Sequence, residues 1–270
     1  MRAPTPTDTI AHVLFVSAAI AYSGVMWEAL AGYPLDPARA YLSELAAENQ
    51  PTSAVFRSLD ALTGVLVLIA MSLHRSRWIS AAADVTARWS AMLLGAFAAL
   101  TVADSLVPLA CAGSADAACA AADAAGTLGL AHQVHAVTSS SALAAATASA
   151  VLLALATGRR RGASPRARPA SRVLRLCLRG GVIVFVGTTV GVSLLAVLSA
   201  SSGTLPDGGG YLQRAQVVLL SVYIAAFPAA AAFDQWNSVS KALRKRLLTG
   251  VKAATPSPMP NVAAVRLRHP

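Results

Sequence analysis

Charged side chains are scarce in this chain: Asp, Glu, Lys and Arg make up 13% of its 270 residues, whereas hydrophobic residues make up 56%. Soluble globular domains carry about 25% charged residues, so the composition excludes that class. The sequence also lacks a phosphate-binding P-loop and a dinucleotide-binding glycine pattern after a strand, which argues against a nucleotide-driven pump. The mean hydropathy of +0.58 instead indicates a membrane protein.

Long apolar runs recur along the chain. Crossing about 30 Å of hydrocarbon takes roughly 20 apolar residues, and the backbone must satisfy its own hydrogen bonds there, so each run is predicted to be a helix. We therefore expect an all-α, polytopic membrane protein, with a six-helix domain over residues 1–236 and a basic, partly disordered tail over residues 237–270. The predicted spans are Ile10–Leu30, Leu59–Leu73, Trp89–Ala110, Leu128–Thr157, Gly180–Ala200 and Ala215–Phe233. The first run ends in a small-x-small pattern typical of signal-peptide cleavage, but its length predicts a retained helix.

Basic residues fall almost entirely on one side of these spans. Of 22 Lys and Arg, only Arg39, Arg57 and Arg214 lie in segments that face the other side. Because basic loops stay in the cytoplasm, this asymmetry predicts cytoplasmic termini, with outward loops at 31–58, 111–127 and 201–214. The expected partners are membrane lipids, with an anionic lipid surface at the cytoplasmic face, and not nucleic acid. Arg outnumbers Lys 19 to 3, a bias typical of GC-rich bacteria, so we expect the bacterial cytoplasmic membrane.

The three cysteines are divided between the two sides. Cys111 and Cys119 share one outward loop, whereas Cys177 lies at the cytoplasmic end of the fifth span. Disulfides persist on the oxidising side of a membrane and are rare on the other. We therefore expect a Cys111–Cys119 disulfide, with two free thiols as the alternative, and we expect Cys177 to be an inert packing residue.

Polar and ionisable residues gather near the outward ends of the spans. An ionisable side chain at the centre of a span costs about 2.5–3.5 kcal/mol on insertion scales, so each marks a candidate functional site. The candidate ligand-binding residues are Ser43, Glu44, Arg57, Asp60, Asp104, His132, His135 and Arg214.

One hypothesis for these residues is a zinc centre. His132 and His135 lie one turn apart and can aim two imidazoles at one ion, and Asp60 or Asp104 would be a third ligand. The open coordination position would hold an activated water. A histidine pair without a third fixed ligand is a weak motif.

Two other hypotheses need no metal. In one, Arg57, Arg214 and the histidines bind an anionic headgroup or another polar ligand, while the carboxylates orient the cations. In the other, the same groups form a structural network that joins the helices. The expected pairs of that network are Arg57–Asp60, Asp104–His and Arg214–Glu44.

Four stretches carry a resemblance to a known family: YLSELAAENQPTSAVFRSLDALTG, DSLVPLAC, HQVHAVTSSSA and LQRAQ. Over about residues 10–235, the chain resembles a bacterial six-helix membrane family known only as domain of unknown function 998. The resemblance implies a six-helix fold but no established activity. It also implies that the family's polar elements fall at Ser43–Glu44, Arg57, Asp60, Asp104, Cys111 and His132.

Two looser likenesses suggest chemistry. The Ser-Glu loop followed by Pro and Phe-Arg is similar to the Frag, DRAM and Sfk membrane proteins, which are associated with lipid and membrane homeostasis. Asp and His at helix ends resemble the ceramidase and progestin-receptor superfamily of membrane hydrolases, whose metal centre uses a further His pair late in the chain. This sequence has no His between His135 and His269, which argues against a zinc hydrolase.

We therefore expect a non-enzymatic membrane protein that binds a lipid headgroup or a small polar ligand at its outward face, without a cofactor. Arg57 and Arg214 would supply positive charge, and the nearby carboxylates and His132 would orient it. The alternative is a metal-dependent membrane lipid hydrolase that uses Asp104, His132 and His135. The third hypothesis is a small-solute transporter, although no clearly broken helix pair is predicted at the midplane.

Overall fold

The computed structural model describes residues 5–73, 85–158, 169–202 and 208–230. The predicted tail over residues 237–270 lies outside this part, as do residues 159–168, which precede the fifth span. Within the described ranges the chain is helical and contains no strand. Its elements are α1 (Pro6–Tyr22), α2 (Gly24–Leu30), the 3₁₀ helix η1 (Leu42–Ala46), α3 (Ser53–Leu73), α5 (Val85–Leu106), α6 (Ala117–Ala124), α7 (Leu130–Gly158), α8 (Pro169–Ser202) and a final helix (Gly209–Ala230).

Five of these helices are long and apolar enough to cross a membrane, and α1 with α2 adds a sixth span if that bent pair counts as one. The chain is therefore a multi-pass membrane protein. Some helices extend further than their apolar runs predicted: α3 begins at Ser53 and the final helix at Gly209. The reason is that the polar side chains in these extra turns are bonded to neighbouring segments, as the site shows below.

The first span is broken, which corrects the prediction of one helix over Ile10–Leu30. α1 and α2 meet at Ser23 at an angle of 53°. The Ile20 carbonyl next to the break accepts hydrogen bonds from Ser23 N (3.2 Å), Ser23 Oγ (2.7 Å) and Trp27 Nε1 (3.0 Å). These bonds satisfy a carbonyl that a continuous helix would have bonded, so the break is tolerated inside an apolar segment.

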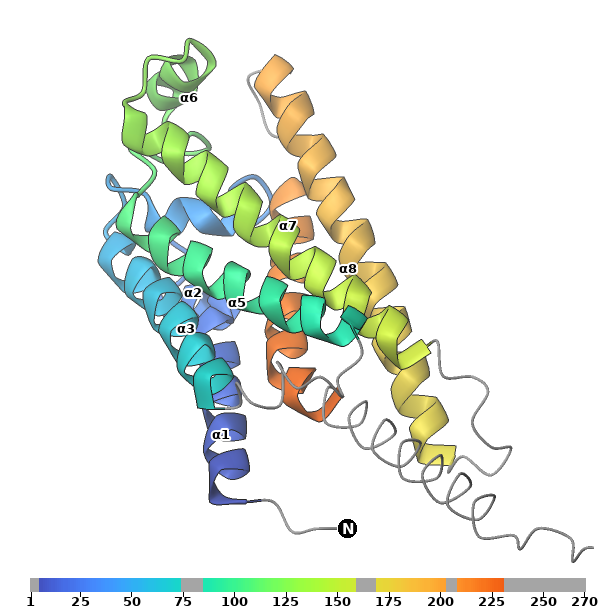
Figure 1. The fold of residues 1–270 in the computed structure, drawn as a ribbon. Coiled ribbons are helices and arrows are strands. Elements are labelled where there is room, and N and C mark those ends of the chain that lie inside the picture. Colours follow the sequence, from blue (N-terminus) through green and yellow to red (C-terminus); the bar gives the residue numbers. More distant parts are fainter. Residues whose placement is uncertain (1–4, 74–84, 159–168, 203–207, 231–270) are drawn as a thin grey trace, which may run out of the picture.

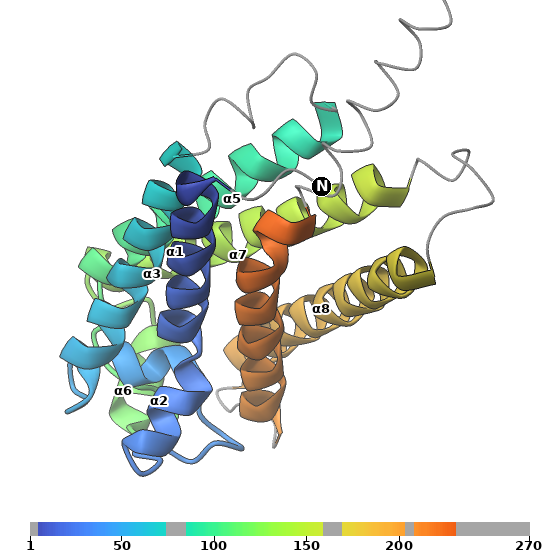
Figure 2. The same cartoon turned by 90° about the horizontal axis from the view of Figure 1, so that it is seen from below.

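The spans pack in chain order, α1 on α3, α3 on α5, α5 on α7 and α7 on α8 (Figure 1). The final helix joins the same hydrophobic core, where Phe227 lies 5.8 Å from Phe15 between ring centroids. Seen from below, α8 runs along one side of the bundle (Figure 2). Its outer face is apolar, with Ile183 72% and Val197 68% exposed, as expected for a helix that contacts lipid.

Small polar residues join the spans inside the core. Ser90 of α5 and Ser149 of α7 each donate a hydroxyl hydrogen bond to the other's carbonyl, at 2.8 and 2.7 Å. The Tyr223 hydroxyl of the final helix lies 2.7 Å from Ser149 Oγ. Sequence reasoning missed this network, because serines are ordinary in membrane helices and nothing in their spacing identifies a partner.

One end of the bundle carries an ordered cap, which we define as residues 31–52 and 107–129. Figure 1 shows its blue segment and α6 at the end opposite the start of α1. The cap has a small core of its own, in which Leu35, Leu42 and Leu45 pack with Phe56 and Ala112. This end contains every candidate residue predicted from the sequence, so the cap sets the geometry of the site.

Candidate functional site

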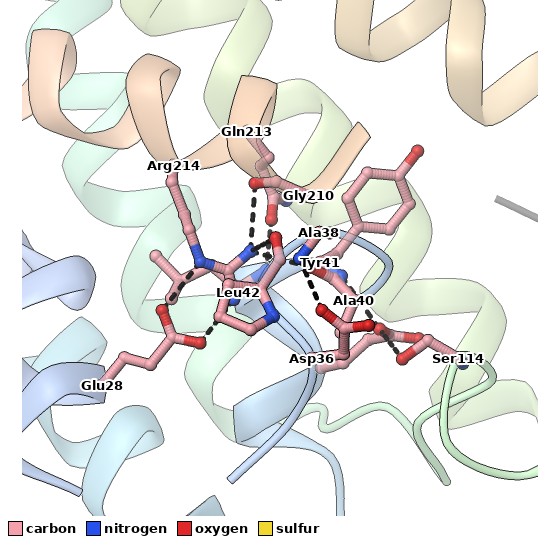
Figure 3. A network of polar contacts seen from close by, with 12 residues as sticks. Glu28, Asp36, Ala38, Ala40, Tyr41, Leu42, Ser114, Gly210, Gln213 and Arg214 are labelled. Carbon is pink, nitrogen blue, oxygen red and sulfur yellow. Dashed lines mark hydrogen bonds and ion pairs between the residues drawn. The ribbon is translucent and has the colours of Figure 1, made fainter. Parts of the chain in front are cut away.

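A buried ion pair joins α2 to the final helix, and its arginine also bonds the first cap segment, residues 31–52 (Figure 3). Arg214 is 6% exposed and Glu28 is 0% exposed. Arg214 Nε donates to Glu28 Oε2 at 2.7 Å, and its Nη2 bonds Glu28 Oε1. Arg214 Nη1 lies 2.9 Å from Pro37 O and 2.8 Å from Ala40 O. The prediction that Arg214 pairs with Glu44 is therefore wrong.

Glu28 is not among the candidate residues predicted from the sequence, because a carboxylate near the end of an apolar run can reach headgroup water without a partner. Only the bend at Ser23 directs α2 so that this carboxylate meets the final helix. Gly210, one turn before Arg214, has Pro37 O and Ala40 O against the position of a Cβ atom. A glycine there lets the cap backbone lie directly on the final helix.

Glu44 joins the two cap segments. Its Oε1 accepts from Ser114 N at 3.0 Å, and its Oε2 accepts from Ser114 Oγ at 2.6 Å and from Tyr41 N at 2.9 Å. Ser43 lies beside it and accepts a long bond of 3.5 Å from Gln213 Nε2. Both oxygens of the carboxylate are thus used within the protein.

The predicted disulfide is confirmed. Cys111 and Cys119 are bonded, with their Cα atoms 6.0 Å apart. The loop that they close contains Ser114, the partner of Glu44, and Ala112, whose N–H donates to Asn49 Oδ1 at 3.0 Å. Cys177 is exposed and does not pack in a core as expected.

The two candidate histidines turn to different partners. His132 Nε2 lies 3.1 Å from Asp123 Oδ1 in α6, and its Nδ1 accepts a weak bond of 3.4 Å from Ala110 N. Both of its ring nitrogens are therefore engaged within the cap. His135 Nδ1 lies 2.9 Å from Val107 O, so this nitrogen carries the proton.

The predicted pairing of Asp104 with a histidine is confirmed. Asp104 Oδ1 lies 3.2 Å from His135 Nδ1 and accepts a hydrogen bond from the Thr138 hydroxyl. Its Oδ2 has no hydrogen-bond partner among the residues that the structure describes. This carboxylate lies in the last turn of α5 and is only partly saturated.

The predicted Arg57–Asp60 ion pair is absent from the described part of the chain. Arg57 Nε instead donates to Ser105 O at 2.9 Å, at the end of α5. Asp60 lies two turns inside α3, and not at its start as predicted, because α3 begins at Ser53. Its carboxyl interacts electrostatically with Asp104, and the Tyr22 hydroxyl interacts with both carboxyls.

The zinc hypothesis needs three converging ligands. No group of three or more His, Cys, Asp and Glu is placed to hold a metal ion within residues 5–73, 85–158, 169–202 and 208–230. The physical reason is that His132 turns to Asp123 while His135 turns to Asp104, although one helical turn separates the two rings. The spacing of His132 and His135 along the helix would allow both rings to point at one ion, but their bonds to Asp123 and Asp104 turn the rings apart.

The candidate residues therefore divide into two groups. The first, which we call the cap network, is bonded to other groups of the protein and comprises Glu28, Ser43, Glu44, His132 and Arg214. The second, the mixed-charge cluster, retains unused hydrogen-bonding groups and comprises Arg57, Asp60, Asp104 and His135. α3, α5 and α7 supply the cluster, and Tyr22 lies beside it at the end of α1.

Comparison with known proteins identifies the family without adding an activity. A family model described as a protein of unknown function (DUF998) matches residues 15–230. No curated protein and no solved structure matches the chain, and the looser likeness to the Frag, DRAM and Sfk proteins finds no support. Because the match covers most of the chain, from within α1 to the end of the final helix, this multi-pass membrane protein belongs to the DUF998 family.

Proposed function

We propose that this protein binds a polar ligand, either a lipid headgroup or a small solute, in the mixed-charge cluster at the cap end of α3, α5 and α7. One observation carries the proposal: Arg57 and Asp60 lie one turn apart in a spanning helix and are not paired with each other. Asp60 has no hydrogen bond or ion pair to any described residue.

Unpaired charges are unfavourable at this position. Ionisable groups in spanning helices normally pair with one another or face a polar cavity, because hydrocarbon does not solvate them. Direct pairing would have satisfied Arg57 and Asp60 without any ligand. Both side chains instead face the last turn of α5, where Ser105 O and Asp104 lie. A bound ligand with polar groups would supply the missing partners.

The cap network has a different part in this proposal. Ser43, Glu44, His132 and Arg214, which the sequence placed among the ligand-binding residues, act as a frame. Their bonds hold the ends of α2, α7 and the final helix in fixed positions around the cluster. A rigid frame keeps the polar groups of a site oriented before the ligand arrives.

We place this end of the molecule on the outward face of a bacterial cytoplasmic membrane. The bonded Cys111–Cys119 pair supports an oxidising side for the cap. The excess of basic residues in the opposite loops supports cytoplasmic termini.

A second candidate function, small-solute transport, is favoured by the break in the first span. Discontinuous spanning helices line the binding sites of many transporters. Here the break at Ser23 directly follows Tyr22, which interacts with both carboxyls of the cluster. Transport and binding would use the same residues, so the ligand-binding test described next applies to both functions.

The test measures thermal unfolding of the full-length protein in mild detergent with a panel of lipids and small zwitterionic solutes. A ligand at 100 times its dissociation constant stabilises a protein by about 2.7 kcal/mol. We expect at least one compound to stabilise the wild type, and we expect Asp60→Asn and Arg57→Gln to reduce that effect.

Two substitutions are matched controls. Glu48→Gln removes an exposed carboxylate from the cap, and Arg88→Gln removes a half-buried guanidinium at the opposite end of α5. Both should respond to ligand as the wild type does. If no compound distinguishes the wild type from the Asp60 and Arg57 variants, the proposal is wrong and the cluster is structural.

A further inference from the structure

We propose that the ligand of the mixed-charge cluster carries a phosphate and a primary ammonium in one small group, as phosphoethanolamine does. The inference rests on the proposed function and specifies the chemistry of its ligand. In this arrangement Arg57 binds the phosphate, and Asp60 with Asp104 binds the ammonium.

The phosphate end follows from the unused donors of Arg57. A guanidinium has five N–H groups, and only the Nε of Arg57 is engaged, with Ser105 O at 2.9 Å. The other four N–H groups form no hydrogen bond to any residue that the structure describes. Those four form the planar fork that binds phosphate oxygens in pairs. The side chain is half-buried, so its donors remain reachable from outside.

The ammonium end follows from the two carboxyls. α3 packs against α5, and Arg57, one turn before Asp60, bonds the carbonyl of Ser105, the residue after Asp104. The two carboxyls therefore lie on neighbouring turns of these helices, and their like charges oppose each other when both are ionised. Thr138 and His135 occupy Asp104 Oδ1, which leaves Asp104 Oδ2 and both Asp60 oxygens as acceptors. A primary ammonium offers three N–H donors and one positive charge, which matches three acceptors and offsets the repulsion.

Ligands with a single charge fit this cluster less well. A phosphate without an amine would meet Arg57 but would be repelled by the neighbouring carboxylates. An amine without a phosphate would leave the four donors of Arg57 unsatisfied. A quaternary ammonium has the right charge but no N–H to donate. Phosphate and primary ammonium joined by a short linker satisfy both halves.

The depth of the cluster suits a headgroup at the membrane boundary. Arg57 and Asp60 lie four and seven residues after Ser53, where α3 begins. At 1.5 Å per residue they are about 6 and 10 Å along the helix axis. Asp104 is two residues from the end of α5 at Leu106. The same chemistry also exists in water, as glycerophosphoethanolamine, so the two sources need separate arms in the experiment.

The experiment measures dissociation constants for the full-length protein in detergent. The probes are phosphatidylethanolamine, phosphatidylcholine and phosphatidylglycerol with identical acyl chains, together with soluble glycerophosphoethanolamine and ethanolamine. We expect phosphatidylethanolamine or glycerophosphoethanolamine to bind about tenfold or more tightly than the other probes, because charge-assisted hydrogen bonds distinguish them. Phosphatidylcholine keeps the phosphate and the positive charge but has three methyl groups in place of the three N–H donors.

Variants then assign the two halves. Arg57→Gln and Asp60→Asn should each weaken phosphatidylethanolamine or glycerophosphoethanolamine binding by about tenfold or more, whereas Arg88→Gln and Glu48→Gln should not. Tight binding of the lipid alone identifies a headgroup, and tight binding of the soluble compound identifies a free solute. The comparison of wild-type affinities holds even if a variant fails to fold.

The remaining outcomes separate this inference from the proposed function. If phosphatidylglycerol or ethanolamine binds most tightly and needs Arg57 or Asp60, the cluster is a binding site but its ligand is not a phosphoethanolamine. Equal affinity for phosphatidylethanolamine and phosphatidylcholine overturns the inference in the same way. If no probe depends on either residue, both proposals fail.

Discussion

The buried Glu28–Arg214 pair permits a sharp test of how the cap is held. Glu28→Gln keeps the size of the side chain and removes its charge. Because Glu28 is 0% exposed and Arg214 is 6% exposed, the guanidinium would stay inside the protein without a counter-ion. Removing one partner of a buried ion pair costs about 3–5 kcal/mol, mainly because the other charge is left uncompensated.

The assay is the free energy of unfolding, measured with denaturant in detergent micelles, for the wild type, Glu28→Gln, Arg214→Gln and the double variant. Each single substitution should lower this free energy by about 3–5 kcal/mol. The double variant should lose less than the sum, because it retains no unbalanced charge. Glu48→Gln, an exposed carboxylate on the same cap segment, should stay within about 0.5 kcal/mol of the wild type.

Two results would refute this reasoning. A loss of less than about 1 kcal/mol for Glu28→Gln would mean that water or lipid headgroups solvate Arg214, against its observed burial. Additive losses in the double variant would mean that the two side chains do not form one energetic unit.

Two further predictions concern the same cap. Reducing the Cys111–Cys119 bond should lower the free energy of unfolding by about 2–3 kcal/mol, because the unfolded chain regains the conformational freedom that the closed loop removes. Denaturant unfolding with and without reductant measures this loss. Cys177→Ala is the control and should leave the free energy of unfolding unchanged. Gly210→Ala should destabilise by about 1–3 kcal/mol, because its Cβ would meet two backbone carbonyl oxygens of the cap. Gly95→Ala in α5 has open space at that position and should be neutral or stabilising in the same unfolding assay, and equal effects for the two glycines would contradict the close contact.

The positions of the spans along the chain could largely be predicted from the sequence. Hydropathy acts along the chain in one dimension, and hydrocarbon demands internal backbone bonding, so long apolar runs become helices whatever their neighbours are. The disulfide could also be predicted, because the two cysteines share one short loop. Where helices extended beyond their apolar runs, as at Ser53 and Gly209, the added turns carry polar groups that bond to the cap. Ser53 Oγ donates to Ala46 O, and Arg214 Nη1 donates to Pro37 O.

The partners of the charged groups were harder to predict. The sequence placed Asp104 with a histidine, which is confirmed. The two residues lie at the facing ends of α5 and α7, which are consecutive spans and pack against each other. The sequence placed Arg214 with Glu44, which is wrong, because no local pattern distinguishes Glu44 from Glu28. The Ser23–Gly24 sequence alone does not predict a bend of 53°, and that bend decides which carboxylate Arg214 reaches.

By itself the sequence determined that this is a helical membrane protein whose polar residues gather at one end. Composition and periodicity suffice for that, because the membrane imposes the same requirement on every span. Tertiary structure alone decided which of those residues are saturated and which remain available. Pairing depends on how helices rotate and bend against one another. Arg214 is therefore buried against Glu28, whereas Arg57 and Asp60 have no ion-pair partner among the residues that the structure describes.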